Sequence, residues 1–144
     1  MTIRPATEAD YPAIHTLLKE FSEFIKTPEK MKVTVEQMTA ASGLFNCIVA
    51  VDDSDAIVGY STYFFGFYSW TGKSLYLDDL YVIEACRGQK VGSQLINYIF
   101  DIARKADCKK VRWQVSNWNK PAQAFYTKCG AVIDDVEINC DLML

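Results

Sequence analysis

Apolar positions near the N-terminus recur with the period of a helix. Within "TEADYPAIHTLLKEFSEFI" they form one stripe, made of Ile14, Leu17, Leu18, Phe21, Phe24 and Ile25. This spacing predicts an amphipathic helix, with Thr7 or Asp10 available as its N-terminal cap. A short strand is expected before it, at "TIRPAT", and a loop with a second short helix that stops near Gly43 is expected after it.

The middle of the chain changes to runs of β-branched and aromatic residues. The runs are "FNCIVAVD", "AIVGYSTYFFGFYSW" and "KSLYLDDLYVI", and the turn-forming stretches "DDSD" and "WTGK" separate them. Such runs favour strands, and short turns favour pairing between neighbours in sequence. The pattern therefore predicts three successive strands, most simply an antiparallel meander.

The last third of the chain alternates between the two periods. Residues 93–106, "SQLINYIFDIARKA", place their apolar side chains on a broad helical face that Ser93 can cap. "KKVRWQVS" alternates as a strand, "KPAQAFYTKCG" predicts a short helix between Pro121 and Gly130, and "AVIDDVEINCDLML" is expected to close the chain as strands. The order β-α-α-β-β-β-α-β-α-β describes an α+β fold in a single domain, residues 1–144.

Composition narrows the partners and the compartment. Fifteen Lys and Arg against eighteen Asp and Glu give a net charge of −3, which argues against nucleic acid or an anionic membrane as a partner and suits a cationic substrate. The five cysteines contain no CxxC pair, so reduced thiols in an intracellular protein are expected, and a metal site is not. The longest apolar runs have the length of strands, and a soluble, cytoplasmic protein is the expectation.

A basic, glycine-bearing turn joins the third strand of the meander to the following helix. The stretch "LYVIEACRGQKVGSQLI" carries Gly88 and Gly92 between the expected strand and helix. Unpaired N–H groups at a helix start can bind an anion, and glycines let its oxygens come close to the backbone. An ordinary β–α turn capped by Ser93 would also account for these residues.

Three motifs in sequence order resemble the GNAT N-acetyltransferase family, and within it the diamine (spermidine/spermine, thialysine) branch. They are "YLDDLYVIEACRG" with "RGQKVGS", then "NWNKPA", then "FYTKCGA". The resemblance implies an α/β/α fold with a mixed, mostly antiparallel central sheet flanked by helices. It also implies acetyl-CoA as co-substrate, no metal, a small-molecule primary amine as acceptor, direct attack on the thioester, and a homodimer.

The resemblance carries the coenzyme site onto three segments. The pyrophosphate would lie on the turn, residues Arg87, Gly88, Gln89, Lys90, Val91, Gly92 and Ser93. The pantetheine arm would pair with the backbone of Leu80, Tyr81 and Val82, with the Val82 N–H facing the thioester oxygen, and would meet Asn119, Pro121 and Ala122. Position 90 is lysine where the family usually has glycine, so Gly88 and Gly92 are expected to hold the turn.

The resemblance also assigns the reacting groups. Tyr126 would be the general acid for the leaving thiolate, although a tyrosine beside Phe125 is more often a packing residue. Asp78 would bind the substrate ammonium and accept its proton, directly or through water, with Asp79 supporting it. In a regular strand the two aspartates would point to opposite faces, and an acid at a strand end in solvent is the simpler alternative.

The acceptor amine stays open at the level of sequence. Positions that are aromatic and acidic in the diamine enzymes correspond here to Phe24 and Ile25. Small lysine-like or thialysine-like amines, polyamines and protein lysines are all compatible with the motifs. A coenzyme-A-binding module without turnover is the alternative to an enzyme.

Overall fold

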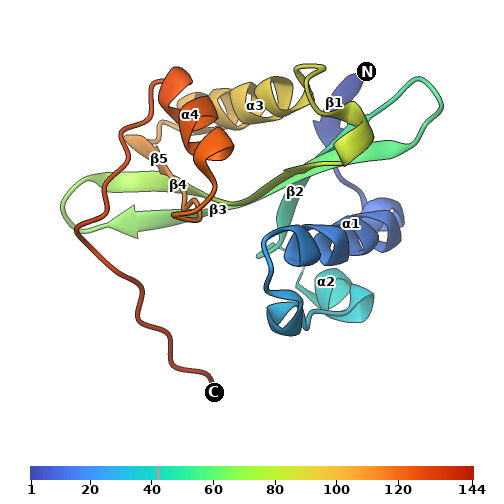
Figure 1. Cartoon of the computed structure of the whole chain (residues 1–144). Helices are drawn as coiled ribbons and strands as arrows, with labels where there is room; N and C mark the ends of the chain where they lie inside the picture. The colour runs from blue at the N-terminus through green and yellow to red at the C-terminus, as the bar shows by residue number, and fades with distance from the viewer. Residues whose placement is uncertain (42) are drawn as a thin grey trace. The chain divides into compact units, whose positions relative to one another are not determined.

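The computed structural model describes residues 1–41 and 43–144, which form two compact units, Met1–Trp113 and Gln114–Leu144 (Figure 1). The first unit contains β1 (Thr2–Pro5), α1 (Tyr11–Phe24), α2 (Val35–Ala40), β2 (Asn46–Val51), β3 (Ile57–Tyr68), β4 (Gly72–Val82), α3 (Val91–Lys105) and β5 (Lys110–Arg112). Three short 3-10 turns, η1 (Glu8–Asp10), η2 (Pro28–Lys30) and η3 (Glu84–Cys86), join them. The second unit contains α4 (Lys120–Lys128). The predicted α+β class is confirmed.

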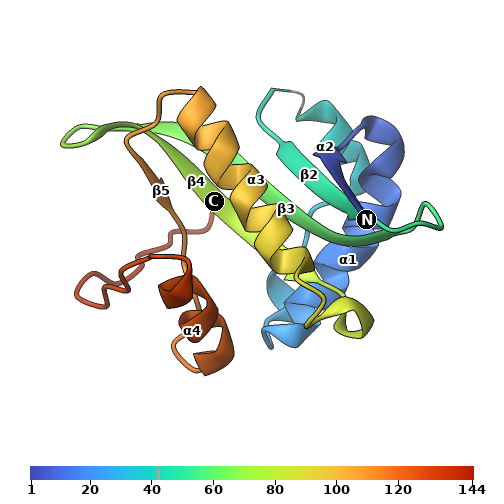
Figure 2. The ribbon, with the colours of Figure 1, turned by 90° about the horizontal axis from the view of Figure 1, so that it is seen from above.

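A five-stranded sheet in the order β1-β2-β3-β4-β5 forms the centre of the first unit. The pairs from β1 to β4 are antiparallel, which confirms the predicted meander, and β4 pairs with β5 in parallel. A parallel pair needs a long crossover connection, and α3 provides it. Figure 2 shows α3 lying across the strands that it connects. With three antiparallel pairs and one parallel pair, the sheet is mixed but mostly antiparallel.

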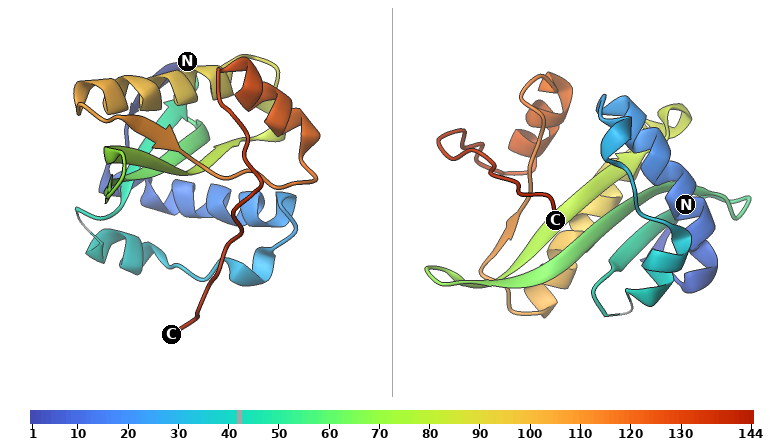
Figure 3. Two further views of the ribbon diagram at one scale, coloured as in Figure 1. Left: turned by 90° about the vertical axis from the view of Figure 1, so that its left-hand side faces the viewer. Right: turned by 90° about the horizontal axis from the view of Figure 1, so that it is seen from below.

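Helices cover both faces of this sheet (Figures 1 and 3). Below it, α1 and α2 bury a cluster made of Ile14, Leu17, Met38, Cys47, Val49, Val51, Tyr60 and Tyr81. Alternate residues of β2, such as Ile48, point to the other face, where α3 contacts the sheet. Five of the six residues of β2 are consequently buried, because neither face of this strand meets solvent.

Gly59 allows β3 and β4 to approach closely beneath α3. A Cβ atom at this position would lie 2.9 Å from the carbonyl oxygen of Tyr81 and 3.3 Å from a methyl group of Leu95. A side chain there would displace backbone, and not merely a flexible neighbour. This glycine helps to hold β3, β4 and α3 together directly before the turn that follows β4.

The start of one predicted helix and the end of one predicted strand differ from the structure. The third helix begins at Val91, two residues before the predicted Ser93, and its N-cap is Lys90, with no side-chain capping bond. Ser93 is therefore inside the first turn of the helix and does not cap it. The strand predicted at "KKVRWQVS" is only three residues long, because its register with β4 covers Lys110 to Arg112 and then ends.

In the second unit the predicted helix is confirmed and the predicted strands are wrong. The Asn119 side chain caps α4 by accepting a hydrogen bond from the Ala122 N–H at 3.2 Å, and Gly130 follows the helix with φ +92°. Residues 131–144 contain no strand, although their apolar side chains alternate. A strand needs a neighbouring strand for its backbone hydrogen bonds, and this segment has none among the described residues.

None of the helices formed by residues 1–41 and 43–144 combines the length and the hydrophobicity that a bilayer crossing requires.

Candidate functional site

A β-bulge sits in β4 at the two adjacent aspartates. Thr62 of β3 pairs with Asp79 and the next residue, Tyr63, pairs with Leu77, so Asp78 is an extra residue opposite the join. The backbone of Asp79 is held there by side chains, since its N–H donates to the Thr62 hydroxyl at 3.1 Å and its carbonyl accepts from the Ser61 hydroxyl at 2.8 Å. A bulge changes the direction in which successive side chains point.

Both aspartates consequently line one cavity, which corrects the expectation that they point to opposite faces. The cavity has a volume of about 650 Å³ and opens beneath the sheet between α1, α2 and β3. Its walls are mainly apolar, with Leu18, Phe21, Ile25, Met31, Val33, Met38, Ala41, Leu44, Phe45 and Phe64 among them. Lys30 and Lys32 also line it. The cavity thus combines an apolar body with two carboxyl groups and two ammonium groups.

The carboxyl groups have raised pKa values for a simple reason. Burial, and to a smaller extent the neighbouring Asp78, raise the pKa of Asp79 to about 7, although the Tyr60 hydroxyl nearby acts to lower this pKa. Asp78 is more open to solvent, yet enclosure by the surrounding protein still raises its pKa above the ordinary range. No cation among the described residues forms an ion pair with either group. A carboxyl with a pKa near 7 can accept and release a proton at neutral pH.

The turn after β4 exposes a helix N-terminus. Gly88 has φ +78° and Lys90 has φ +64°, so the second left-handed position is filled by lysine, and Gly92 lies within the helix. The first helical hydrogen bond runs from the Gln94 N–H to the Lys90 carbonyl at 3.0 Å. The N–H groups of the three residues before Gln94 therefore have no acceptor within the helix.

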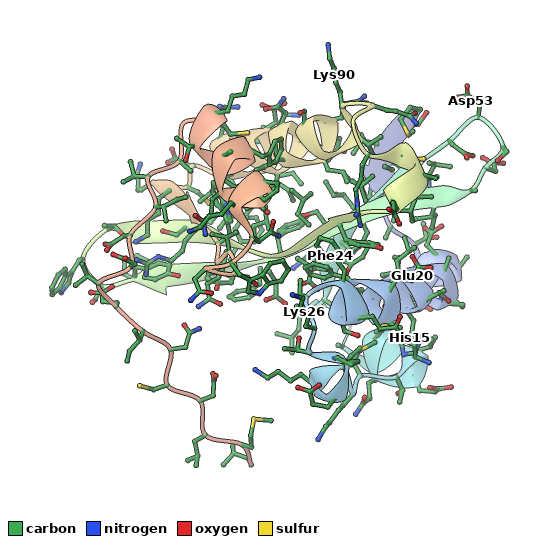
Figure 4. The ribbon with its side chains drawn as sticks, viewed as in Figure 1. His15, Glu20, Phe24, Lys26, Asp53 and Lys90 are labelled. Carbon is green, nitrogen blue, oxygen red and sulfur yellow. The ribbon has the colours of Figure 1, made fainter. Side chains whose placement is uncertain are left out.

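The two basic side chains of the turn point in different directions. The Arg87 guanidinium lies 4.6 Å from the Phe24 ring centroid and 5.6 Å from that of Tyr81, and its Nε donates to the Val82 carbonyl at 3.1 Å. Figure 4 shows the Lys90 side chain extending away from the ribbon at the start of α3. The turn therefore offers backbone N–H groups, while Arg87 connects it to α1.

The strand before the turn leaves one edge of its backbone open. β5 pairs with β4 only at Ser74, Leu75 and Tyr76. Further along β4, Leu80, Tyr81 and Val82 pair with β3 on one side and, among the described residues, with no strand on the other. An extended ligand can add to such an edge as a further strand does.

The remaining predicted residues belong to the second unit. Pro121 and Ala122 lie in the first turn of α4, directly after the capping Asn119. Tyr126 lies on the same helix, is buried, and has its ring centroid 5.3 Å from that of Phe125. The first unit by itself brings Asp78 and Asp79 to one cavity. The second unit by itself places Pro121, Ala122 and Tyr126 on one short helix that Asn119 caps.

Several residues around Asp79 or at the cavity were missed by sequence reasoning. Tyr60, Ser61 and Thr62 on β3 surround Asp79, and Lys30 and Lys32 come from the polar loop before α2. Nothing in the spacing of the β3 residues marks them, because the register of β3 against β4 brings them to Asp79. Among the described residues, no three His, Cys, Asp or Glu side chains gather as a metal site would require.

Comparisons with known proteins agree with this geometry. The profile of the Acetyltransferase (GNAT) family matches residues 11–131. The mouse (Mus musculus) thialysine N-epsilon-acetyltransferase is 33% identical over 140 residues, which cover 90% of this chain and 82% of that protein. The D-amino-acid N-acetyltransferase HPA3 of Saccharomyces cerevisiae is 27% identical over 141 residues, covering 94% of this chain and 88% of that protein.

Solved structures agree at the level of the fold. An aminoglycoside acetyltransferase from an uncultured soil metagenomic sample, in complex with sisomicin, superposes with a TM-score of 0.82 at 18% identity, covering 99% of this chain and 95% of that one. The family match spans the bulged strand, the exposed helix N-terminus and α4. The chain therefore belongs to the GNAT acetyltransferase family, whose members use acetyl-CoA as co-substrate, and is an N-acetyltransferase.

Proposed function

We propose that this protein transfers the acetyl group of acetyl-CoA to a small primary amine by direct attack of the amine on the thioester. The observation that carries the proposal is the pair of aspartates at the bulge, which share one largely apolar cavity and form no ion pair among the described residues. A carboxyl group that is largely removed from water and has no ion-pair partner, as at Asp79, destabilises a fold, and such groups concentrate at functional sites. An ammonium substrate would supply the missing positive charge.

In the proposed reaction, Asp78 and Asp79 hold the ammonium, and Asp78 takes its proton, directly or through a water molecule. The neutral amine then has the lone pair that attacks the thioester carbonyl, and the carbon–sulfur bond breaks as the amide forms. Tyr126 donates its proton to the departing thiolate, and the second proton that the nitrogen loses as the amide forms restores the Tyr126 hydroxyl. The Val82 N–H stabilises the negative charge that develops on the carbonyl oxygen.

The coenzyme would lie along the open edge of β4 and end at the turn. The backbone of Leu80, Tyr81 and Val82 supports pairing with the pantetheine arm, and the helix N-terminus from Arg87 to Ser93 supports a pyrophosphate. Because Arg87 is engaged with Phe24 and Tyr81, its contribution to the pyrophosphate would come from the backbone. Asn119, Pro121 and Ala122 would meet the arm at the start of α4, and residues 1–144 would then act as one domain.

The charges of the cavity favour an amine with an anionic end over a polyamine. Lys30 and Lys32 line the same cavity as the aspartates. A lysine-like molecule can place its ammonium at the aspartates and its carboxylate near the lysines, whereas the second ammonium of a diamine would meet positive charge. Protein lysines remain the second candidate substrate, but a largely apolar cavity of about 650 Å³ favours a small molecule.

The exposed C-terminal segment supports a homodimer in the cytoplasm as the working form. Val136, Ile138 and Leu142 are 83%, 85% and 85% exposed. Apolar side chains at alternate positions of an extended segment suit addition to a strand of a second copy. The five cysteines are free, which fits a reducing compartment.

A matched pair of amines tests the proposed substrate. Thiol release from acetyl-CoA is measured with ε-aminocaproate and with cadaverine, which have similar length but differ in the charge at the far end. We expect a higher kcat/KM for ε-aminocaproate, and we expect Lys30→Glu combined with Lys32→Glu to reverse the preference. Equal use of both amines by the parent protein would contradict the role of the lysines, and no amine-dependent thiol release across a wider panel would contradict the function.

A further inference from the structure

Tyr60 lies at the centre of the first unit, directly beside the acid pair. It is 0% exposed, pairs with Val49 of β2 on one side and with Tyr81 of β4 on the other, and its ring centroid is 6.2 Å from that of Tyr81. Successive side chains alternate between faces along β3, so Tyr60 and Thr62 share the face that meets Asp79. Tyr60 is therefore placed by three neighbouring strands and not by a flexible loop.

Its hydroxyl group is the one buried side-chain oxygen or nitrogen, among the described residues, that lacks a hydrogen-bond partner of good geometry. An unsatisfied buried hydroxyl costs free energy, and a phenylalanine would fill the same space without that cost. The hydroxyl nevertheless lies close enough to Asp79 to lower the pKa of that carboxyl, and the charge of Asp79 raises the pKa of Tyr60 in return. A buried hydroxyl group that destabilises the fold at this position suggests that it has a function.

The groups that face Asp79 include no ion-paired cation among the described residues. Asp78 and Tyr81 on β4, Tyr60 and Thr62 on β3 and Cys47 on β2 lie around Asp79. Lys30 and Lys32 line the same cavity, and Glu20 on α1 accepts a hydrogen bond from the Tyr81 hydroxyl at 3.5 Å. The uncharged Leu18, Phe21, Ser22 and Ile25 complete the α1 wall of the cavity. Tyr60 is consequently an enclosed neutral donor on this face whose hydroxyl, unlike those of Thr62 and Tyr81, is engaged by no other group among the described residues.

We propose that Tyr60 is a positioning residue for acetyl transfer, whose buried hydroxyl donates a hydrogen bond to the Asp79 carboxylate and keeps it ionised and oriented beneath the substrate ammonium. This rests on the proposed function. Once an ammonium binds, the negative charge on the pair strengthens this hydrogen bond. The proton leaves the amine nitrogen and ends on the acid pair, while Tyr60 keeps its own proton, because burial raises its pKa.

The first experiment measures the acid directly and does not depend on activity. The carboxyl carbon of Asp79 is followed by ¹³C NMR against pH, with Asp79→Asn identifying the signal. We expect a midpoint near neutral pH in the parent protein and a midpoint higher by about half a unit or more in Tyr60→Phe, since an anion loses its donor. The control is Tyr98→Phe, which removes the same group from α3 on the opposite face of the sheet, and it should leave the midpoint unchanged.

The second experiment uses turnover. In Tyr60→Phe the acid limb of the kcat/KM profile should move to higher pH, so that the rate falls about threefold or more near pH 6.5 and returns to within about twofold of the parent near pH 9. Acetyl-CoA affinity should not change. An unmoved Asp79 midpoint with a lowered melting temperature would show that Tyr60 is only structural. A moved midpoint in a protein that releases no thiol would uphold the Tyr60–Asp79 contact and overturn the proposed function instead.

Discussion

Two aspartates of the first unit, Asp10 and Asp79, have opposite surroundings. Asp10 accepts two hydrogen bonds from the guanidinium of Arg4, at 2.8 and 2.9 Å, and this pair holds the pKa of the Asp10 carboxyl far below its usual range. Asp79 has no ion-paired cation among the described residues, and burial raises its pKa to about 7. Asp10 therefore stays ionised at neutral pH, whereas Asp79 can exchange a proton there.

The backbone produces this difference. Asp10 ends η1, where its carboxylate also accepts from the Thr7 N–H at 2.7 Å, so it connects β1 to the start of α1. Asp79 follows the extra residue of a bulge and is turned into a cavity. The Asp10 carboxylate accepts hydrogen bonds from Arg4 and Thr7, which stabilise its charge. The Asp79 carboxylate has no such set of donors among the described residues. The comparison teaches that the surroundings, and not the residue type, mark an acid as a candidate for function.

The largest expected effect separates the two aspartates by activity. Asp79→Asn should lower turnover by about 10²-fold, because it removes a charge and a proton-accepting group at nearly constant volume. Asp10→Asn makes the same chemical change at the other position and should leave turnover within about twofold in the folded protein. Steady-state thiol release with a saturating amine measures both. Equal losses in the two variants would remove the distinction.

A loss of similar size is expected for Tyr126, on the acetyl-CoA side of the reaction. If Tyr126 protonates the thiolate, Tyr126→Phe should lower kcat by about 10²-fold, with the affinity for acetyl-CoA and the melting temperature nearly unchanged. Unlike the aspartate variants, this variant should keep the acid limb of the pH–rate profile, since the acid pair is intact. Turnover within about twofold of the parent would assign the proton donor to another group.

A smaller effect concerns stability, and its sign differs between the two sites. The folded-state pKa of Asp10 lies below the unfolded value, so its contribution is present above about pH 4 and is lost as pH falls towards the folded pKa. The folded-state pKa of Asp79 lies above the unfolded value, so its contribution is present below about pH 4 and is lost as pH rises through about 7.

Melting temperatures near pH 8 should therefore move in opposite directions. Asp10→Asn should melt a few degrees below the parent, and Asp79→Asn should melt a few degrees above it, with the second difference fading towards pH 4. Calorimetry or a dye-based thermal scan across this pH range measures both changes. A stabilising Asp10→Asn or a destabilising Asp79→Asn near pH 8 would contradict the assignment of the two roles.

Local pattern predicted much of the fold. The apolar stripes of α1 and α3 and the β-branched runs of β2, β3 and β4 are properties of each segment alone. The length of β5 and the absence of strands at 131–144 depend on partner strands, which no segment contains in its own sequence. The Lys90 cap depended on a left-handed φ of 64°, which lysine adopts rarely.

For the candidate site, too, the sequence predicted residues but not the contacts that depend on strand pairing. Asp78 and Asp79 stand out as acids in an apolar run, so the sequence marks them. Their common direction does not follow from that run, because the bulge arises from the register of β4 against β3. Tyr60 could not be singled out either, since a tyrosine in a strand is ordinary and only its enclosed hydroxyl next to Asp79 makes it distinctive.

The most direct test of the account is the pH–rate profile of Asp78→Asn with the amine that the parent prefers. If Asp78 accepts the ammonium proton, turnover should fall by about 10²-fold at neutral pH and recover partly at alkaline pH, where more of the amine is already neutral. Acetyl-CoA affinity should stay nearly the same. A profile parallel to that of the parent, without alkaline recovery, would contradict the assignment of the acid pair as the proton acceptor.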